Sequence, residues 1–272
     1  MRLLAISDLH LGHPVNRERF ATIGESPDDW LILAGDVGET EAHLALAFAW
    51  LRPRFAQVIW VPGNHELWTS DRVQTLRGDE KYQALVALAR GFGVLTPEDP
   101  YPFWPGTASD RTLAIVPMFL LYDYSFRPDD VAYDQVLAWA GEERISCADE
   151  MLLSPHPWPD RASWCAARVA LTEARLRELP PDCQTVLINH FPLRQAHARL
   201  PRIPRFTPWC GTRATETWPE RYRALAVVYG HLHIRREFSE NGTRFHEVSL
   251  GYPRQWDQTR PVEAYVKVIL EV

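Results

Sequence analysis

Short apolar runs recur along the whole chain and are separated by longer segments that carry polar residues. Six of these runs are only a few residues long, and they cover 3–7, 30–34, 58–61, 113–118, 185–189 and 225–230. Runs this short and uniformly apolar are typical of strands buried on both faces. Two later segments, 244–252 and 262–270, are also predicted as strands, the second because its apolar residues alternate with polar ones.

Apolar residues between these strands follow helical spacing. This spacing predicts helices over 40–51, 79–93 and 161–179. Asp79 is a candidate N-cap of the second helix, and the third ends before Pro180 because proline cannot continue a helix. Strands that alternate with helices predict an α/β protein whose sheet is covered on its faces.

Three proline-rich stretches interrupt the alternation, at 97–110, 153–160 and 192–219. The third spans 28 residues, and so long a loop inside a compact domain is usually functional. It contains five arginines and one glutamate, which gives it a local charge of +4 (5 − 1). No stretch resembles a linker between two cores, so we expect a single domain over 1–272.

The composition narrows the class of protein. Of the 272 residues, 46% are hydrophobic and 24% are charged, as in globular proteins, and the net charge of −6 disfavours nucleic acid as a partner. No apolar run approaches the roughly 18 residues that span a membrane, so no membrane partner is expected. The four cysteines form no C-x-x-C pair, and the first residues lack the pattern of a secretion signal. We therefore expect a cytoplasmic protein with reduced thiols, and the oligomeric state is left open.

Side chains suited to metal binding directly follow five of the predicted strands. They are Asp8, His10, Asp36, Asn64, His190, His231 and His233. Ligands bind at the carboxyl ends of strands in open α/β sheets, so we expect these side chains to meet there. Carboxylate, imidazole and amide groups suit Mn, Fe, Zn or Co. Seven ligands exceed what one octahedral ion takes, but they divide between two ions if one carboxylate bridges them.

A pair of metal ions about 4 Å apart is a standard device for attacking phosphate esters. Two divalent ions, two aspartates and a shared hydroxide would leave a net charge of about +1, which favours an anionic phosphate. His65 adjoins a candidate ligand and titrates near neutral pH, so we expect it to be the general acid for the leaving alkoxide. Glu66 is expected to support the site by hydrogen bonds. Glycines precede ligands in three turns and are expected to permit unusual backbone conformations, at Gly35, Gly63 and Gly230.

Five ordered motifs resemble the signature of the calcineurin-like metallophosphoesterases. They are D-x-H from residue 8, G-D from 35, G-N-H-E from 63, N-H from 189 and G-H-x-H from 230. The resemblance implies an α/β fold, a four-layer αββα sandwich of two packed mixed β-sheets flanked by helices. It implies that one metal binds Asp8, His10, Asp36 and His233, and that the other binds Asp36, Asn64, His190 and His231. Asp36 would be the bridge and His65 the proton donor.

Longer stretches resemble the actinobacterial branch of this family, among them SPDDWLILAGDV, FAQVIWVPGNHELWT and SLGYPRQW. That branch includes hydrolases of the phosphodiester that joins 4′-phosphopantetheine to acyl carrier protein. The resemblance implies this substrate, cleaved by a hydroxide that bridges two metals, with Mn and/or Fe favoured and Zn also compatible. The alternatives are a phosphomonoester or phosphodiester of a small molecule or nucleotide, and a non-catalytic, metal-stabilised interaction scaffold. A scaffold should have lost ligands, whereas every position of the pattern is filled.

Candidate substrate contacts lie outside the ligand set. His13 follows the first motif and could touch the phosphate, while Trp68 and Tyr122 are expected to line a pocket for an extended organic group. Carrier proteins are strongly acidic, so the arginine-rich segment after the N-H motif is expected to bind one. The candidates there are Arg199, Arg202 and Arg205. Core packing of the aromatic residues and a solvated basic surface are the alternative interpretations.

Overall fold

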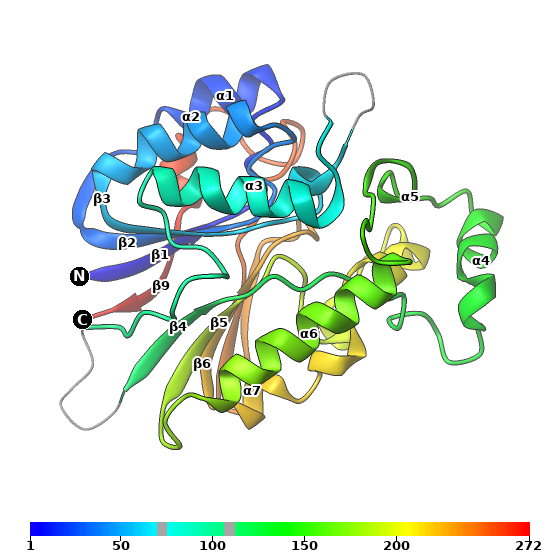
Figure 1. The fold of residues 1–272 in the computed structure, drawn as a ribbon. Coiled ribbons are helices and arrows are strands. Elements are labelled where there is room, and N and C mark those ends of the chain that lie inside the picture. The colour runs from blue at the N-terminus through cyan, green and yellow to red at the C-terminus, as the bar shows by residue number, and fades with distance from the viewer. Residues whose placement is uncertain (70–74, 106–111) are drawn as a thin grey trace.

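The computed structural model describes residues 1–69, 75–105 and 112–272, and its strands form two mixed sheets (Figure 1). The first sheet has the order β3 (Phe55–Val61), β2 (Ser26–Ala34), β1 (Arg2–Ile6) and β9 (Lys267–Glu271). The second has the order β4 (Leu113–Pro117), β5 (Gln184–Ile188), β6 (Ala224–Tyr229), β8 (Thr243–Glu247) and β7 (Arg236–Glu240). Each sheet is parallel except at one edge, because β9 runs antiparallel to β1 and β7 runs antiparallel to β8.

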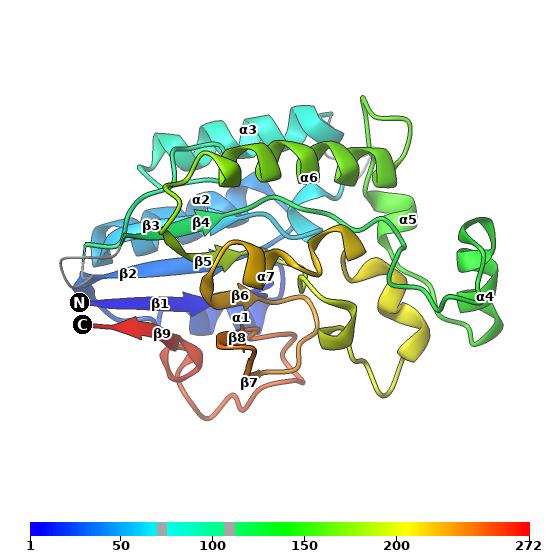
Figure 2. The same cartoon turned by 90° about the horizontal axis from the view of Figure 1, so that it is seen from below.

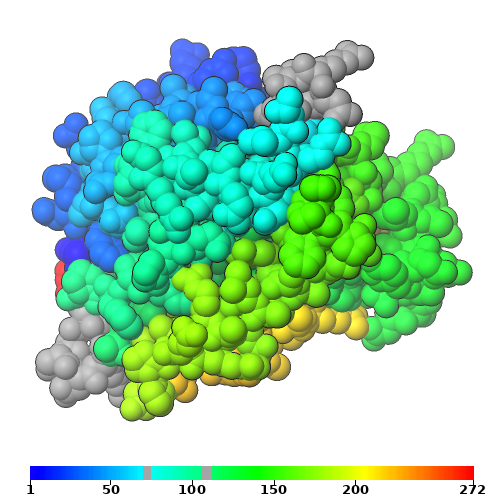
Figure 3. Space-filling model, viewed as in Figure 1, coloured from blue at the N-terminus to red at the C-terminus, as the bar shows by residue number. Residues whose placement is uncertain are grey.

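Helices cover the outer faces of both sheets. The chain forms α1 (Pro14–Phe20), α2 (Glu41–Leu51), α3 (Gly78–Gly91), α4 (Val136–Glu142), α5 (Asp149–Leu152), α6 (Arg161–Arg177) and α7 (Trp218–Arg221). Figures 1 and 2 show α1, α2 and α3 on the side of the first sheet, while α7 lies on the side of the second. The segments of α3 and α6 cover much of the face seen in the space-filling view of Figure 3. Among the described residues, no helix has the length and apolarity needed to cross a membrane.

The side chains of each strand point alternately to the two faces of its sheet, and they form the apolar layers of the fold. In β1, Leu4 and Ile6 pack in the cluster that contains the apolar residues of α2 and α3, whereas Leu3 and Ala5 pack against the second sheet. In the second sheet, Val228 of β6 faces the first sheet and Val227 faces the side of α7. Because successive residues of a strand point to opposite faces, each strand contributes to two apolar layers. The expected αββα sandwich of two mixed sheets flanked by helices is confirmed.

Some predicted boundaries were wrong. β8 ends at Glu247 rather than extending to residue 252, because the chain leaves the sheet there and turns toward β1. In the last predicted strand, residues Val262–Tyr265 form a 3₁₀ turn and only β9 is extended. Arg77, not Asp79, is the N-cap of α3. The short elements α1, α4, α5, α7 and β7 were not predicted, since a few residues carry too little periodicity to be recognised.

The irregular stretches have partly ordered structure. Residues 192–219 form a series of 3₁₀ turns, η4 (Gln195–His197), η5 (Pro204–Trp209) and η6 (Arg213–Thr215), before α7 begins. Within the predicted loop 97–110, residues 106–110 lie outside the described residues. The termini lie side by side, since β1 and β9 are neighbours (Figure 2).

Candidate metal centre

All seven candidate ligands come together at the carboxyl ends of five parallel strands. Asp8 and His10 follow β1, Asp36 follows β2 and Asn64 follows β3 in the first sheet. From the second sheet, His190 follows β5, and the pair His231 and His233 follows β6. The packing of the two sheets places these edges against each other, so the site is built from both sheets, whereas the strand pattern alone predicts only that the ligands meet at the carboxyl ends of strands.

The turns that carry the ligands are held in an uncommon backbone conformation. Positive φ angles occur at Asp8 (53°), His10 (43°), Asp36 (52°), His231 (69°) and His233 (53°). Non-glycine residues rarely adopt such angles, and they persist where surrounding structure enforces them, often at functional sites. Here, Asp8 N donates to Gly35 O at 2.9 Å and His10 N donates to Asp36 O at 3.0 Å, which ties the first two turns together.

The glycines of these turns serve two different purposes. Only Gly35 among the three has a positive φ, of 89°. A Cβ on Gly63 would lie 2.1 Å from Asp36 Oδ1, and one on Gly230 would lie 2.3 Å from Asp8 Oδ2. The expectation of unusual backbone conformation therefore holds for Gly35, whereas the other two are required by close approach to a carboxylate.

Ligand atoms from different strands converge closely enough to share an ion. Oxygen and nitrogen atoms lie within 4.8 Å of one another in three groups: Asp8, His10 and His233; His10, Asp36 and His65; and Asp8, Asp36 and His190. The Nε2 atoms of His10 and His233 are 3.1 Å apart, and His190 Nε2 is 3.4 Å from Asp36 Oδ2. Asp8 and Asp36 each occur in two groups, which places carboxylates between the imidazoles.

Several of these atoms have no hydrogen-bond partner among the described residues although they are buried. They include Asn64 Oδ1, His190 Nε2 and His231 Nε2. The opposite ring nitrogen of His190 lies 2.9 Å from Ala34 O, and His233 Nδ1 lies 2.7 Å from Gln255 Oε1. Each of these Nδ1–H groups therefore donates to an oxygen, which turns the Nε2 atom of its ring toward the ligand cluster. A buried acceptor without a partner costs free energy, and a cation would satisfy it. The donor set thus fits metal ions.

Burial and neighbouring charges set the protonation of the cluster. Burial lowers the pKa of His10 and of His231 to about 3, so both rings are neutral and able to bind a metal. Burial opposes the charge of Asp36, but the imidazoles of His190 and His65 outweigh it and hold the pKa of Asp36 well below its usual range. In turn Asp36 overcomes burial and raises the pKa of His190 to about 10. A metal cation binding here would displace that proton.

Glu66 supports the metal-site turns through the backbone. Its carboxylate accepts from the N–H groups of Asp36 at 3.0 Å, Val37 at 2.8 Å and Gly63 at 2.9 Å. Burial raises the pKa of Glu66 to about 7. Because one side chain joins the turns after β2 and β3, the expected hydrogen-bonding role of Glu66 is confirmed.

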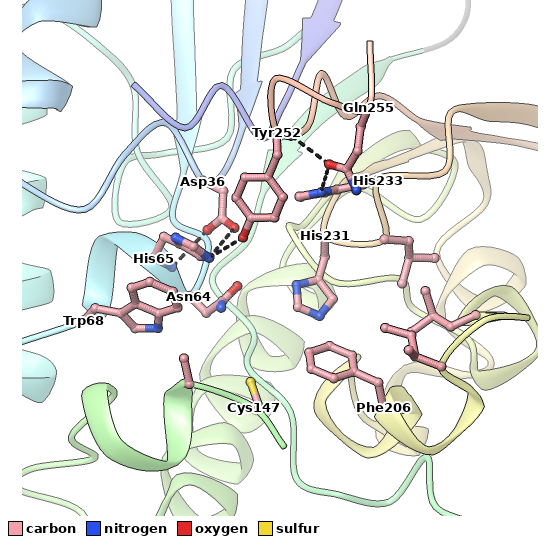
Figure 4. Close-up of a pocket in the computed structure, with 14 residues that line it drawn as sticks. Asp36, Asn64, His65, Trp68, Cys147, Phe206, His231, His233, Tyr252 and Gln255 are labelled. Carbon is pink, nitrogen blue, oxygen red and sulfur yellow. Dashed lines mark hydrogen bonds and ion pairs between the residues drawn. The ribbon is translucent and has the colours of Figure 1, made fainter. Parts of the chain in front are cut away.

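His65 lies between the carboxylates of Asp36 and Glu39 at the edge of the cluster, and Figure 4 shows it beside Asp36. Its Nε2 is 3.8 Å from Asp36 Oδ2 and its Nδ1 is 3.5 Å from Glu39 Oε1. Burial opposes protonation, but Asp36 and then Glu39 outweigh it and raise the pKa of His65. The ring packs on Trp68 with centroids 3.6 Å apart. A protonated imidazole that faces a cavity is suited to donate a proton to a leaving group.

A cavity of about 290 Å³ opens beside this cluster. Figure 4 shows His65, Trp68 and Asn64 on one side of it and His231 and Phe206 on the other, while the Tyr252 ring points toward His65. The lining residues are Asp36, Asn64, His65, Trp68, Cys147, Ala148, Leu200, Ile203, Phe206, His231, Leu232, His233, Tyr252 and Gln255. The cavity therefore joins polar ligands to an apolar wall contributed by residues 200–206.

The candidate substrate contacts are placed unevenly. Trp68 lines the cavity, whereas His13 is half-buried beside the Tyr252 ring and does not line it. The structure does not bring Tyr122 to the cavity either. Tyr122 is completely buried and packs against Tyr124 and Phe191 in the hydrophobic core, so its prediction as a lining residue is corrected to the core-packing alternative.

The arginines of residues 192–219 also divide into two kinds. Arg205 forms ion pairs with Glu142 at 2.6 Å and Glu143 at 3.1 Å, which anchors η5 to α4. Arg199 and Arg202 are exposed and have no ion pair with any described residue. Only these last two are free to meet a partner, since Arg205 is already neutralised.

Sequence reasoning missed three residues of the site. Tyr252 stacks on the His10 ring with centroids 4.4 Å apart, and its OH lies 3.4 Å from His65 Nε2. Gln255 Oε1 faces His233 Nδ1, and Asp149 accepts a hydrogen bond from Asn64. The stretch SLGYPRQW contains both Tyr252 and Gln255, but the predicted strand 244–252 includes Tyr252 and so concealed the turn that brings it to the site. Asp149 lies in a four-residue helix and gave no signal.

Comparison with known proteins identifies the family of this chain. A family model described as calcineurin-like phosphoesterase matches residues 1–235. The acyl-carrier-protein phosphodiesterase PptH of Mycobacterium tuberculosis is 48% identical over 262 residues, which make up 95% of this chain and 80% of that protein. The crystal structure of phosphopantetheinyl hydrolase (PptH) from the same organism has a TM-score of 0.93 and 47% identity, covering 99% of this chain and 95% of that one.

Proposed function

Because the chain belongs to the calcineurin-like phosphoesterase family, we propose that it is a dimetal hydrolase of a phosphodiester, that of 4′-phosphopantetheine on acyl carrier protein. The observation that carries the hydrolase is the convergence of seven ligand side chains from both sheets, among them buried atoms that have no hydrogen-bond partner in the described residues. The observation that carries the substrate is the similarity to PptH, a carrier-protein phosphodiesterase, over nearly the whole chain.

The seven ligands divide into two sets that share Asp36. The first set is Asp8, His10, Asp36 and His233, and the second is Asp36, Asn64, His190 and His231. Carboxylate, imidazole and amide oxygen favour Mn and/or Fe, and Zn is also compatible. When bound, such a pair of ions supplies positive charge for phosphoryl oxygens and acidifies a water molecule. The protein in turn fixes the ligands rigidly, through the strained turns and through Glu66.

His65 supplies the proton that the leaving group needs. The carboxylates of Asp36 and Glu39 favour its protonated form, and Trp68 holds the ring at the cavity wall. The Tyr252 OH lies 3.4 Å from Nε2, so this nitrogen faces the cavity side of the ring where Tyr252 and the substrate phosphate would meet it. In a carrier protein the leaving group is a serine alkoxide, which is a strong base and therefore depends on such a donor.

The far side of the cavity suits an extended organic group and an acidic partner. Leu200, Ile203 and Phe206 form an apolar wall, and the Phe206 ring lies beside the ring of His231. Ile203 is 39% exposed, so this wall reaches the surface. Arg199 and Arg202 flank the wall and are exposed, which places free positive charge where an acidic carrier protein would dock.

We infer a single domain over residues 1–272, because β9 near the C-terminus pairs with β1 at the N-terminus. A cytoplasmic location is supported by the four cysteines, Cys147, Cys165, Cys183 and Cys210, which are buried and unpaired.

A panel of esters tests the proposed reaction class. The metal-loaded protein is given a chromogenic phosphodiester, the matching phosphomonoester and a nucleotide at equal concentrations. The proposal predicts that the diester is hydrolysed with the highest kcat/KM of the three. A preference for the monoester or the nucleotide would instead support the alternative small-molecule activity, and two bound metals without turnover of any ester would support the scaffold.

A further inference from the structure

We propose that Asp149 is a positioning residue of the metal centre, whose single carboxylate oxygen orients both Asn64 and Trp68. Asp149 is the first residue of α5 and is completely buried. Its Oδ1 accepts from Asn64 Nδ2 at 2.9 Å and from Trp68 Nε1 at 2.6 Å. The proposal rests on the proposed function in one respect, namely that Asn64 binds a metal.

The bond from Asn64 decides which end of its amide faces the ligand cluster. An amide carries an NH₂ donor and an oxygen acceptor, whereas Asp149 Oδ1, which also accepts from the indole N–H of Trp68, serves only as an acceptor. Asp149 therefore requires the NH₂ of Asn64 to point toward α5 and leaves the oxygen to point away. That oxygen is buried and has no hydrogen-bond partner among the described residues. Only the oxygen can bind a metal, so Asp149 selects the orientation that binding needs.

The hydrogen bond from Trp68 to Asp149 also affects His65, the proposed proton donor. Trp68 is the residue on which the His65 ring packs, with centroids 3.6 Å apart. Its indole N–H is fixed by Asp149, and its carbonyl accepts from Lys81 Nζ. Figure 4 shows Asn64 and Trp68 projecting from neighbouring positions toward the same side of the cavity. One oxygen thus positions a metal ligand and the surface that supports His65.

The helix that carries Asp149 is itself anchored to this loop. Trp68 and Leu153 form an antiparallel bridge, and Thr69 N donates to Leu152 O at 2.8 Å. From the other side, Arg161 donates to Asp149 O at 2.6 Å and to Leu153 O at 3.1 Å. The backbone that carries the carboxylate is consequently held on both sides, by the loop of Trp68 and Thr69 and by the Arg161 side chain, as a positioning role requires.

Two variants test whether the hydrogen bonds of Asp149 are required. D149N and D149L both replace the carboxylate with a side chain that branches at Cγ, but only asparagine retains an oxygen that accepts from Asn64 and Trp68. M151A is the control on the same helix, because Met151 is 84% exposed. W68F is the second control, since it removes the indole donor and leaves the bond to Asn64. The metal-free proteins are titrated with Mn²⁺ by calorimetry, after circular dichroism has shown that they are folded.

The proposal predicts two bound Mn²⁺ in wild type, D149N, M151A and W68F. In D149L one of the two should bind about 10- to 100-fold more weakly, the range seen when such supporting partners are removed. Equal Mn²⁺ binding in D149L and wild type would overturn the role of Asp149. If D149L does not fold, D149A takes its place with the same two outcomes. Fewer than two Mn²⁺ in wild type would contradict the proposed dimetal centre itself, which separates the two failures.

Discussion

His65 illustrates how neighbours turn an ordinary side chain into a specialised one. A free imidazole has a pKa near 6.5, and burial alone would lower it. Here the carboxylates of Asp36 and Glu39 reverse that effect, and the Trp68 indole fixes the ring. Both carboxylates favour a protonated ring, whereas a histidine that binds a metal must lose its proton. These neighbours therefore suit a proton donor and not a metal ligand.

Replacing His65 with alanine tests this role. We expect kcat for an alkyl phosphodiester to fall about 10²- to 10⁴-fold, the usual contribution of a general acid, and kcat for a 4-nitrophenyl ester to change little. Metal content by elemental analysis should stay at two ions per chain. H13A is the control, because His13 lies near the cluster without lining the cavity. Unchanged turnover of the alkyl ester would refute the proton-donor role.

At the scale of elements, residues 192–219 combine an anchored part with a free part. Arg194 binds Glu220 and Glu240, Arg205 binds α4, and both therefore hold the segment to the body of the protein. Arg199 and Arg202 remain exposed beside the apolar wall of the cavity. Most of the positive charge of this segment is therefore used in ion pairs within the protein. Two arginines, Arg199 and Arg202, remain available to a partner.

Charge reversal of these two arginines tests the docking surface. R199E/R202E should raise KM for holo acyl carrier protein about tenfold, mainly by slowing association, and the effect should shrink at high salt. The kcat/KM for a small chromogenic diester should be unchanged. R244E/R260E, at exposed positions that do not line the cavity, is the matched control. Equal losses on both substrates would contradict a docking role.

Strand β8 carries a titratable side chain, His246, that does not line the cavity. His246 is buried, neither ring nitrogen has a hydrogen-bond partner among the described residues, and burial lowers its pKa to about 4. The folded state therefore favours the neutral ring, and stability is lost as pH falls from the unfolded value near 6.5 toward 4.

Replacing His246 with phenylalanine should remove this pH dependence. Between pH 7.5 and pH 5, wild type should lose about 2 kcal/mol more of unfolding free energy than H246F. Urea denaturation of the metal-free proteins at both pH values measures the difference, so that metal release does not contribute. The same loss in both proteins would show that His246 titrates normally in the folded state.

Elements and ligands differ in how far the sequence predicts them. Three ligands were predictable because each follows a strand that is apolar throughout, namely Asp8, Asp36 and His190. Such a strand is easily recognised in the sequence, and the residue after it must lie at the carboxyl edge of the sheet. Asp149 was not predictable, because it meets Asn64 across 85 residues of sequence and lies in a single helical turn. Tyr122 was misplaced since an aromatic residue suits a core and a pocket equally well, and only tertiary packing separates the two.

At the scale of the whole molecule, the metal centre lies where the two sheets meet. Its ligands follow strands β1, β2 and β3 of the first sheet and β5 and β6 of the second. Bound ions would therefore join two layers that otherwise contact through apolar residues such as Leu3, Ile59 and Val186. Metal binding and folding are coupled in such a site.

Removing the metals should lower the thermal stability of the entire fold. An ion at 100 times its Kd contributes about 2.7 kcal/mol, so two ions at that ratio raise Tm by roughly 10 °C for a chain of this length. Differential scanning calorimetry before and after EDTA, and after Mn²⁺ is restored, measures the change. We expect one cooperative transition in each state, as a single domain requires. An unchanged Tm would contradict ligation across both sheets.

The most direct measurement of the central claim is the intact mass of holo acyl carrier protein incubated with the metal-loaded chain. The account predicts that the carrier protein loses the mass of its 4′-phosphopantetheine group and regains a free serine. D36N, which removes the shared carboxylate, should be at least 100-fold slower and should bind fewer than two metals by elemental analysis. An unchanged holo mass, from a preparation that holds two metals and hydrolyses a small diester, would contradict the proposed substrate.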